Sequence, residues 1–223
     1  MQRTIGRFHV LTDYHFQQRY SHAEIARLAI EGGADTIQFR EKHSGIRHVL
    51  KEAAETAEVC RRQSAVFVVD DRIDVAQAVS ADGVHLGQSD FPIPAARRVL
   101  GPEALIGGTA TTLEQALRIE DDGADYVGFG PVFKTASKRN PASVKGLATL
   151  TRVCEAVGVP VIAIAGVTAE RVESVMNAGA HGIAVMTAIT LAANPVRAAA
   201  DIRAALDAAS GADTVVGRTD GLT

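Results

Sequence analysis

Two acidic loop ends in this sequence have the chemistry to hold a divalent cation. The apolar run 66–69 stops at Asp70 and Asp71, and a second short run, 84–86, leads into a loop that ends at Asp90. If the two runs form neighbouring parallel strands, Asp71 and Asp90 leave the sheet at the same end and can face each other. Two carboxylates so placed suit Mg2+, which keeps several waters and takes further oxygen ligands from a substrate phosphate. The alternative is that these aspartates are ordinary polar loop residues or helix caps.

Basic and polar residues that follow the other apolar runs can supply donors to phosphate groups. In the stretch 38–42, Gln-Phe-Arg-Glu-Lys, a two-residue period directs Gln38, Arg40 and Lys42 to one side. Taken alone, Arg40 and Lys42 beside Glu41 are better explained as a solvated charge cluster. The stretch 135–139, rich in Thr, Ser and Lys, is by itself more typical of a flexible polar loop. The remaining positions of interest after apolar runs are Thr109, Thr135, Ala136, Ser137, Lys138, Gly166, Met186 and Thr187.

The combination of these residues predicts two phosphorylated ligands and one metal ion at a single mouth. Gly166 and Thr187 follow the last two apolar runs, where barrel enzymes often bind a phosphate group through backbone N–H groups. With Mg2+ between the two aspartates, and Arg40 and Lys138 nearby, the other ligand is expected to be a diphosphate. Charge grows on the oxygens of a departing diphosphate, so fixed cations stabilise the transition state more than the bound substrate. No Ser or Cys has an apparent base partner, so the acceptor should be a second substrate.

Short apolar runs separated by amphipathic stretches predict a parallel sheet whose strands alternate with helices. Several runs follow a small-residue link such as Gly33-Ala34-Asp35 or Gly123-Ala124-Asp125, in which glycine ends the preceding helix. Because the runs are continuously apolar, the strands are expected to be covered on both faces. About eight such units predict an α/β fold, a single-domain (β/α)8 TIM barrel, with a doubly wound open sheet as the alternative. The runs are 8–12, 36–39, 66–69, 84–86, 105–107, 126–129, 161–164 and 183–186.

Composition limits the classes of partner that this 223-residue chain can have. A formal net charge of -3, only 4% aromatic residues and the lack of Trp argue against a nucleic-acid surface. No apolar run is long enough to span a bilayer, and the first residues lack the apolar region of a signal peptide. We expect a cytoplasmic protein without a nucleic-acid or membrane partner, and a homo-oligomer is compatible with the sequence. The barrel should occupy residues 1–207, followed by a flexible tail over 208–223.

Several motifs resemble those of the thiamine phosphate synthase and thiazole tautomerase family, and the resemblance extends from about His9 to about Leu206. It implies a Mg2+-dependent barrel enzyme of thiamine biosynthesis. The reaction would join 4-amino-2-methyl-5-(diphosphooxymethyl)pyrimidine to 4-methyl-5-(2-phosphooxyethyl)thiazole, giving thiamine phosphate and diphosphate. In that family the diphosphate leaves first, and the thiazole nitrogen captures the resulting pyrimidine methylene cation. The matching motifs are 38–42 (QFREK), Asp71-Arg72, 83–90 (GVHLGQSD), 123–133 (GADYVGFGPVF), 135–138 (TASK) and Gly179-Ala180.

The resemblance also assigns roles to individual positions. Asp71 and Asp90 would be the Mg2+ ligands, and Arg40, Thr109 and Lys138 would assist departure of the diphosphate. The implied residues for binding the pyrimidine diphosphate are Gln38, Phe39, Arg40, Glu41, Lys42, Asp70, Thr109 and Lys138. Those for the thiazole phosphate are Thr135, Ala136, Ser137, Gly166, Met186 and Thr187.

Three positions depart from the family pattern, and one of them is Thr109, which replaces a usual Ser and keeps the hydroxyl. Asp70 stands where the family usually has Asn, so an extra carboxylate should either repel the diphosphate or join the metal shell. Ala165 precedes Gly166 where the family has a Gly-Gly pair, which matters less if Gly166 makes the phosphate contact.

Three other functions have different sequence requirements. A thiazole tautomerase would place a histidine shortly after the run 105–107, where this chain has Thr109-Ala110-Thr111-Thr112. A non-catalytic phosphate-binding barrel would have no reason to keep the two aspartates and Lys138 together. A metal-dependent sugar-phosphate epimerase barrel would need histidine ligands near the strand ends, and the seven scattered histidines do not supply that pattern.

Overall fold

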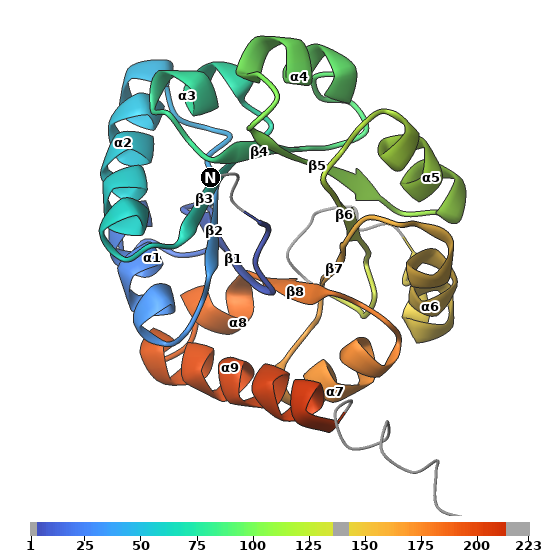
Figure 1. Ribbon diagram of the computed structural model, residues 1–223. Coiled ribbons are helices and arrows are strands. Elements are labelled where there is room, and N and C mark those ends of the chain that lie inside the picture. Colours follow the sequence, from blue (N-terminus) through green and yellow to red (C-terminus); the bar gives the residue numbers. More distant parts are fainter. Residues whose placement is uncertain (1–3, 136–142, 213–223) are drawn as a thin grey trace, which may run out of the picture.

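Eight parallel strands close into a barrel, and helices surround it on the outside (Figure 1). The computed structural model describes residues 4–135 and 143–212. Each strand pairs with the next along the chain, and the last strand returns to pair with the first. This closure confirms the predicted (β/α)8 barrel and excludes the doubly wound open sheet. The strands are β1 (Phe8–Asp13), β2 (Thr36–Arg40), β3 (Val66–Asp70), β4 (Gly83–Leu86), β5 (Leu105–Ala110), β6 (Tyr126–Phe129), β7 (Val161–Ile164) and β8 (Gly182–Val185).

The helices return the chain from the carboxyl end of one strand to the amino end of the next. The first begins with a capping box, in which Ser21 Oγ accepts from the Glu24 N–H and the Glu24 carboxylate accepts from the Ser21 N–H. Within the described ranges, no helix is both long enough and apolar enough to cross a membrane. The helices are α1 (His22–Glu31), α2 (Ile46–Arg62), α3 (Ile73–Ala78), α4 (Ile93–Leu100), α5 (Leu113–Asp121), α6 (Gly146–Ala156), α7 (Ala169–Asn177), α8 (Thr187–Thr190) and α9 (Pro195–Ala212).

The last helix differs from the expected domain limit. α9 continues to Ala212, past residue 207, where we expected the barrel to end and a tail to begin. Alanine is the strongest helix former, and the segment 195–212 is rich in it, so helix propensity extends the element. Residues 213–223, the remainder of the predicted tail, lie outside the described residues.

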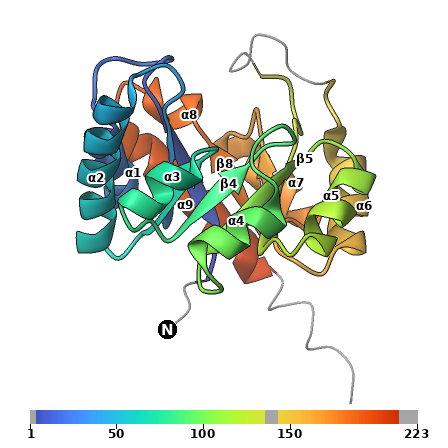
Figure 2. The same ribbon diagram turned by 90° about the horizontal axis from the view of Figure 1, so that it is seen from above.

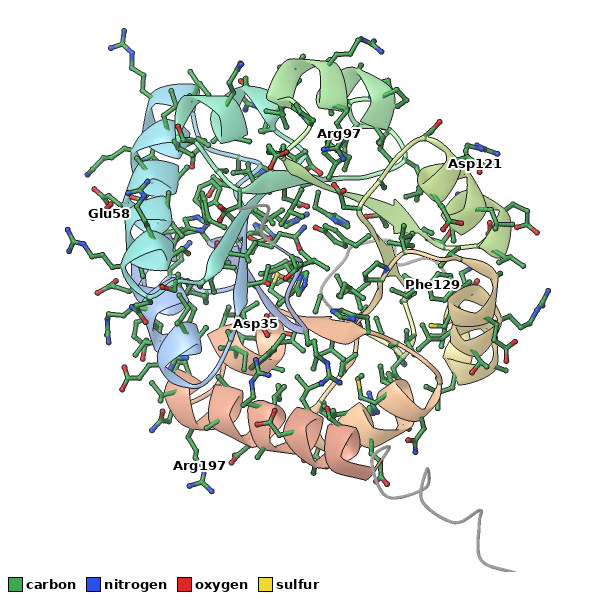
Figure 3. The ribbon with its side chains drawn as sticks, in the orientation of Figure 1. Asp35, Glu58, Arg97, Asp121, Phe129 and Arg197 are labelled. Atoms are coloured by element: carbon green, nitrogen blue, oxygen red, sulfur yellow. The ribbon has the colours of Figure 1, made fainter. Side chains whose placement is uncertain are left out.

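Two apolar layers hold the barrel together. One lies between the strands and the helices, and the other fills the barrel interior, where Leu11, Val68, Leu105, Tyr126 and Ile162 meet. A side chain at Gly107 would overlap the buried Tyr126 ring, so this position requires glycine. Figure 3 shows side chains filling the interior, while charged groups such as Glu58 on α2 and Arg197 on α9 lie on the outer surface.

Aspartates in the links before three strands close the amino end of the barrel. The Asp35 carboxylate accepts from the N–H groups of Arg7 and Phe8 at 3.1 and 3.0 Å. Asp82 accepts from the Phe67 N–H at 2.8 Å, and Asp125 accepts from the Ile106 N–H at 2.7 Å. Each link therefore supplies an acceptor to the first residues of the preceding strand, which lack a strand partner for those N–H groups. The opposite end of the barrel, which carries the loops after the strands and α8, is seen in Figure 2.

Candidate functional site

Polar side chains from the first three strands meet at the carboxyl end of the barrel. Asp13, Arg40 and Asp70 are the last residues of β1, β2 and β3, and the strand register pairs Asp13 with Arg40. The Arg40 guanidinium donates from Nη1 to Asp13, and its Nε lies 3.2 Å from an Asp70 oxygen. Gln38 Nε2 donates to the other Asp70 oxygen at 3.0 Å. The structure thus brings Gln38, Arg40 and Asp70 together.

The two aspartates proposed as metal ligands also meet at this mouth. The side chain of Asp71 lies close enough to that of Asp90 to raise the pKa of Asp90, and Lys42 Nζ forms an ion pair with Asp71. Asp71 has a φ of 64°, in the left-handed region, and its N–H donates to the His85 carbonyl at 2.9 Å. Asp90 accepts from the Gly87 N–H at 2.7 Å. Backbone bonds therefore hold the loops after β3 and β4 so that their carboxyl groups face each other.

The cluster carries an excess of negative charge. Counting the described residues, four carboxylates (Asp13, Asp70, Asp71 and Asp90) face two cations (Arg40 and Lys42), which leaves a formal charge of -2 when all are ionised. Burial, together with the nearby Asp71 charge, raises the pKa of Asp70 to about 7, although Arg40 and Lys42 act in the opposite direction. Burial and the adjacent Asp71 side chain likewise raise the pKa of Asp90. Crowded carboxylates of this kind are stabilised by a divalent cation.

The arrangement fits a cation that takes only part of its ligands from the protein. Among the side chains that the structure describes, no group of three or more His, Cys, Asp or Glu is placed to hold a metal. Asp71 and Asp90 would therefore supply two oxygens, and water or a substrate phosphate would supply the rest. This ligand set is usual for Mg2+ and unusual for a closed structural metal site.

A hydrogen-bonded chain of side chains forms the floor of the mouth. The Tyr126 hydroxyl lies 3.1 Å from His85 Nδ1, and His85 Nε2 lies 2.8 Å from Thr109 Oγ1. Burial raises the pKa of Tyr126 well above its usual value, so the phenol stays protonated. Thr109 thus reaches the mouth as expected from sequence, but its hydroxyl is held by a histidine. The sequence did not single out Tyr126, although it lies within the motif 123–133.

A second group of backbone segments lies after β6, β7 and β8. Ala165 and Gly166 have φ values of 77° and 68°, and the loop after β6 is bound to this turn because the Phe133 N–H donates to the Ala165 carbonyl at 3.2 Å. A Cβ at Gly166 would lie 2.6 Å from the Lys134 carbonyl oxygen, so glycine is required there. Met186 and Thr187 stand at the start of α8.

The remaining expected site residues fall into two sets. Phe39 is buried between strands and helices, 4.5 Å from the His22 ring centroid, and Glu41 accepts from the N–H groups of His43 and Ser44 in its own loop. The side chains of Phe39 and Glu41 are therefore not brought into the cluster. Thr135 is the last described residue of its loop, and Ala136, Ser137 and Lys138 lie outside the described residues.

Comparison with known proteins identifies relatives over nearly the whole barrel. The sequence profile of the thiamine monophosphate synthase family matches residues 8–189. The thiamine-phosphate synthase of Salinibacter ruber is 60% identical over 206 residues, which cover 92% of this chain and 91% of that protein. The chain belongs to the thiamine monophosphate synthase family. The match of this family to residues 8–189 includes Asp13, Gln38, Arg40, Asp71 and Asp90.

Two further family members agree with this assignment. The thiamine-phosphate synthase of Methanocella arvoryzae is 45% identical over 196 residues, covering 88% of this chain and 92% of that protein. The structure of thiamine phosphate pyrophosphorylase from Pyrococcus furiosus superposes with a TM-score of 0.84 at 37% identity, and the match covers 91% of this chain and 96% of that one. The family resemblance inferred from the sequence motifs is therefore confirmed.

Proposed function

We propose that the protein is a thiamine phosphate synthase, which transfers a pyrimidinylmethyl group from its diphosphate to the nitrogen of a thiazole phosphate. Family membership supports the reaction class, and the observation that carries the site assignment is the cluster of Arg40 and Lys42 with the paired Asp71 and Asp90. Cations and paired carboxylates at one mouth suit a metal-bound diphosphate better than a single phosphate.

Asp71 and Asp90 would hold Mg2+, whose role when bound is to neutralise the charge that develops on the leaving diphosphate. Gln38, Arg40 and Lys42, which lie beside these aspartates, would orient the diphosphate. In the structure, Arg40 and Lys42 are paired with carboxylates, so they contact acidic partners until the substrate and its cation arrive. Without substrate the cluster keeps its formal excess of negative charge, and a bound Mg2+ would offset that excess.

Departure of the diphosphate is the step that these cations would accelerate. As the C–O bond breaks, both bonding electrons go to the diphosphate oxygen, and the methylene carbon is left electron-poor. An ion pair about 4 Å apart is worth roughly 4 kcal/mol at an effective dielectric near 20, so each fixed cation contributes at most about a thousandfold. Lys138 and the Thr109 hydroxyl are proposed to assist at the same oxygens.

The second substrate would lie across the mouth, against the loops after β6, β7 and β8. Backbone N–H groups of the turn at Gly166 and of the segment Met186–Thr187, with the hydroxyls of Thr135 and Ser137, are proposed to bind its phosphate. This placement would direct the thiazole nitrogen towards the carbon from which the diphosphate departs. Holding both reactants in one site removes the entropy cost of their encounter from the chemical step.

The test is release of diphosphate from the pyrimidine substrate with both substrates present, with and without Mg2+, beside a thiazole isomerisation assay. Thiamine phosphate formed in step with diphosphate, only with Mg2+, supports the proposal. Thiazole isomerisation without diphosphate release would instead assign the protein to the tautomerase reaction. Failure of both reactions would leave a phosphate-binding barrel without either activity.

A further inference from the structure

Asp13 is a buried carboxylate at the mouth for which the sequence motifs assign no role. Only 3% of the residue is exposed, and it ends β1 directly beside Arg40 on β2. Burial of a carboxylate is unfavourable unless charged or hydrogen-bonding partners compensate it. Asp13 has both, because Oδ1 accepts from the His15 N–H at 2.8 Å and Oδ2 accepts from Arg40 Nη1.

These bonds fix the Arg40 guanidinium at two points. Nη1 is bound to Asp13, and Nε lies 3.2 Å from Asp70, on the neighbouring strand. The guanidinium is planar, so two contacts to carboxylates on different strands set its plane as well as its position. The contacts with Asp13 and Asp70 are made by Nη1 and Nε, so Nη2 is the amino group that can approach a ligand. The Arg40 side chain is 22% exposed, so this contact occurs at the surface of the mouth.

An arginine held only at its backbone would behave differently at this site. Its long side chain would sample several rotamers and would be drawn further towards the acidic loops after β3 and β4, where Asp71 and Asp90 stand. Asp13 opposes that shift from the side of β1. It is itself fixed by the turn that follows β1, because the His15 N–H sets the direction of its carboxylate.

We propose that Asp13 is a positioning residue that orients Arg40 so that Nη2 meets the diphosphate of the pyrimidine substrate. This inference rests on the proposed function, since it assigns Asp13 to the same substrate site. Asp13 acts through Arg40 and has no contact of its own with the reacting atoms. Its loss should therefore impair use of the pyrimidine substrate and leave binding of the thiazole phosphate unaffected.

The substitution Asp13→Asn tests this with little change in volume. The His15 N–H keeps the amide oxygen on its own side, so the amide NH2 group faces Arg40, and a donor then meets a donor. We expect kcat/KM for the pyrimidine diphosphate to fall on the order of a hundredfold, as for a misplaced catalytic group. KM for the thiazole phosphate should change less than about twofold, because that substrate does not meet Arg40.

A double-mutant cycle shows whether Asp13 acts through Arg40. Kinetics are measured for Asp13→Asn, Arg40→Ala and the double variant. If Asp13 works by orienting Arg40, the double variant should be no worse than Arg40→Ala within about twofold. The proposal would be overturned if the losses in kcat/KM of the two single variants multiplied in the double variant. It would also be overturned if Asp13→Asn raised KM equally for both substrates.

Asp35→Asn is the matched control at the opposite end of the barrel. Asp35 also pairs with an arginine, Arg203, at 2.8 Å, and also accepts backbone N–H groups. This variant should lower stability, and it should not change KM for the pyrimidine diphosphate relative to KM for the thiazole phosphate.

Asp13→Ser is a second probe, since its hydroxyl can still accept from the His15 N–H. If both Asp13 variants fail to fold, Asp13 is structural and the proposal is wrong. Wild-type protein without diphosphate release would refute the proposed function instead.

Discussion

The two ends of the barrel use aspartate in opposite ways. At the amino end, Asp35, Asp82 and Asp125 each accept a backbone N–H of a neighbouring strand, and two of them also pair with Arg203 and Arg97. At the carboxyl end, Asp70, Asp71 and Asp90 crowd together, and within residues 4–135 and 143–212 the ion pairs of Asp70 and Asp71 are those with Arg40 and Lys42.

The difference lies in how well the structure compensates each charge. Carboxylates at the amino end satisfy donors that would otherwise be buried and unpaired, so removing one leaves an uncompensated N–H group. Carboxylates at the mouth repel one another, and the pKa values of Asp70 and Asp90 are raised. Acidic residues whose charge the fold does not balance indicate a place where a ligand or metal completes the balance.

The largest expected effect comes from removing one member of the acidic pair at the mouth. Asp71→Ala and Asp90→Ala should each lower the rate of diphosphate release by about a thousandfold or more, since a bound cation supplies several kcal/mol of charge stabilisation. Stability should fall less than in Asp125→Ala, because relief of the repulsion within the pair offsets the lost contact, the Lys42 ion pair for Asp71 or the Gly87 hydrogen bond for Asp90. Rates and urea unfolding of the same preparations check this; normal turnover would show that the pair does not hold the metal.

Asp125→Ala at the amino end should give the reverse pattern. The Ile106 N–H would lose its acceptor, and Arg97 would lose an ion-pair partner at 2.7 Å. We expect the free energy of unfolding to fall by about 1–3 kcal/mol, with the rate per folded molecule unchanged. Denaturant melts measure the free energy of unfolding, and enzyme rates are measured at denaturant concentrations where the variant is still folded. If the rate of Asp125→Ala fell as far as that of Asp90→Ala, the two ends of the barrel would not differ in the way described.

A pH dependence of stability should arise near the amino end. Burial lowers the pKa of His9 to about 4, from an ordinary value near 6.5, so the folded state favours the neutral ring. The unfolded chain binds the proton more readily than the folded chain. The stability that the protein gains from keeping His9 neutral is therefore fully present above about pH 6.5 and is lost as the pH falls towards 4. For His9 alone, stability should be roughly 2 kcal/mol lower at pH 5 than at pH 7. Urea melts of wild type and His9→Gln at pH 5 and pH 7 check this. If the free energy of unfolding differed between the two pH values as much in the variant as in the wild type, the prediction would be contradicted.

The smallest predicted effect concerns Ala165, a left-handed residue in the turn after β7. Ala165 has a φ of 77°, which costs a residue with a Cβ roughly 1–2 kcal/mol, partly offset by the greater freedom of glycine when unfolded. Ala165→Gly should therefore raise stability by about 0.5–1 kcal/mol without loss of activity. Thermal unfolding measures the gain, and a clear loss of stability would show that the Ala165 methyl group makes compensating contacts.

Much of the fold followed from hydrophobic pattern alone. Each of the eight apolar runs marks a strand, and Met186 alone among their residues lies past its strand, at the start of α8. The match is good because barrel strands are covered on both faces and leave little room for polar residues. β5 extends to Ala110, three residues beyond the run that predicted it, since Gly108 and Thr109 carry no hydrophobic signal. The extension of α9 beyond residue 207 was missed because its last turn lacks an apolar stripe.

The placement of the candidate site residues could be predicted from the sequence where it depends on the two-residue period of a strand or on the order of the loops. Gln38 and Arg40 lie on one side of β2 and meet at Asp70, whereas the same period turns Phe39 outwards into the core. Asp13 was missed because its pairing with Arg40 depends on the register between β1 and β2, which residue order does not encode locally. The contact of Tyr126 with His85 likewise depends on closure across the barrel.

The most direct test of the account is a calorimetric titration of the protein with inorganic diphosphate, with and without Mg2+, for wild type and Asp90→Asn. The account predicts tight binding by the wild type only when Mg2+ is present, and loss of that Mg2+ dependence in the variant. Equal affinity of the wild type with and without Mg2+, or unaltered Mg2+-dependent binding by Asp90→Asn, would contradict it.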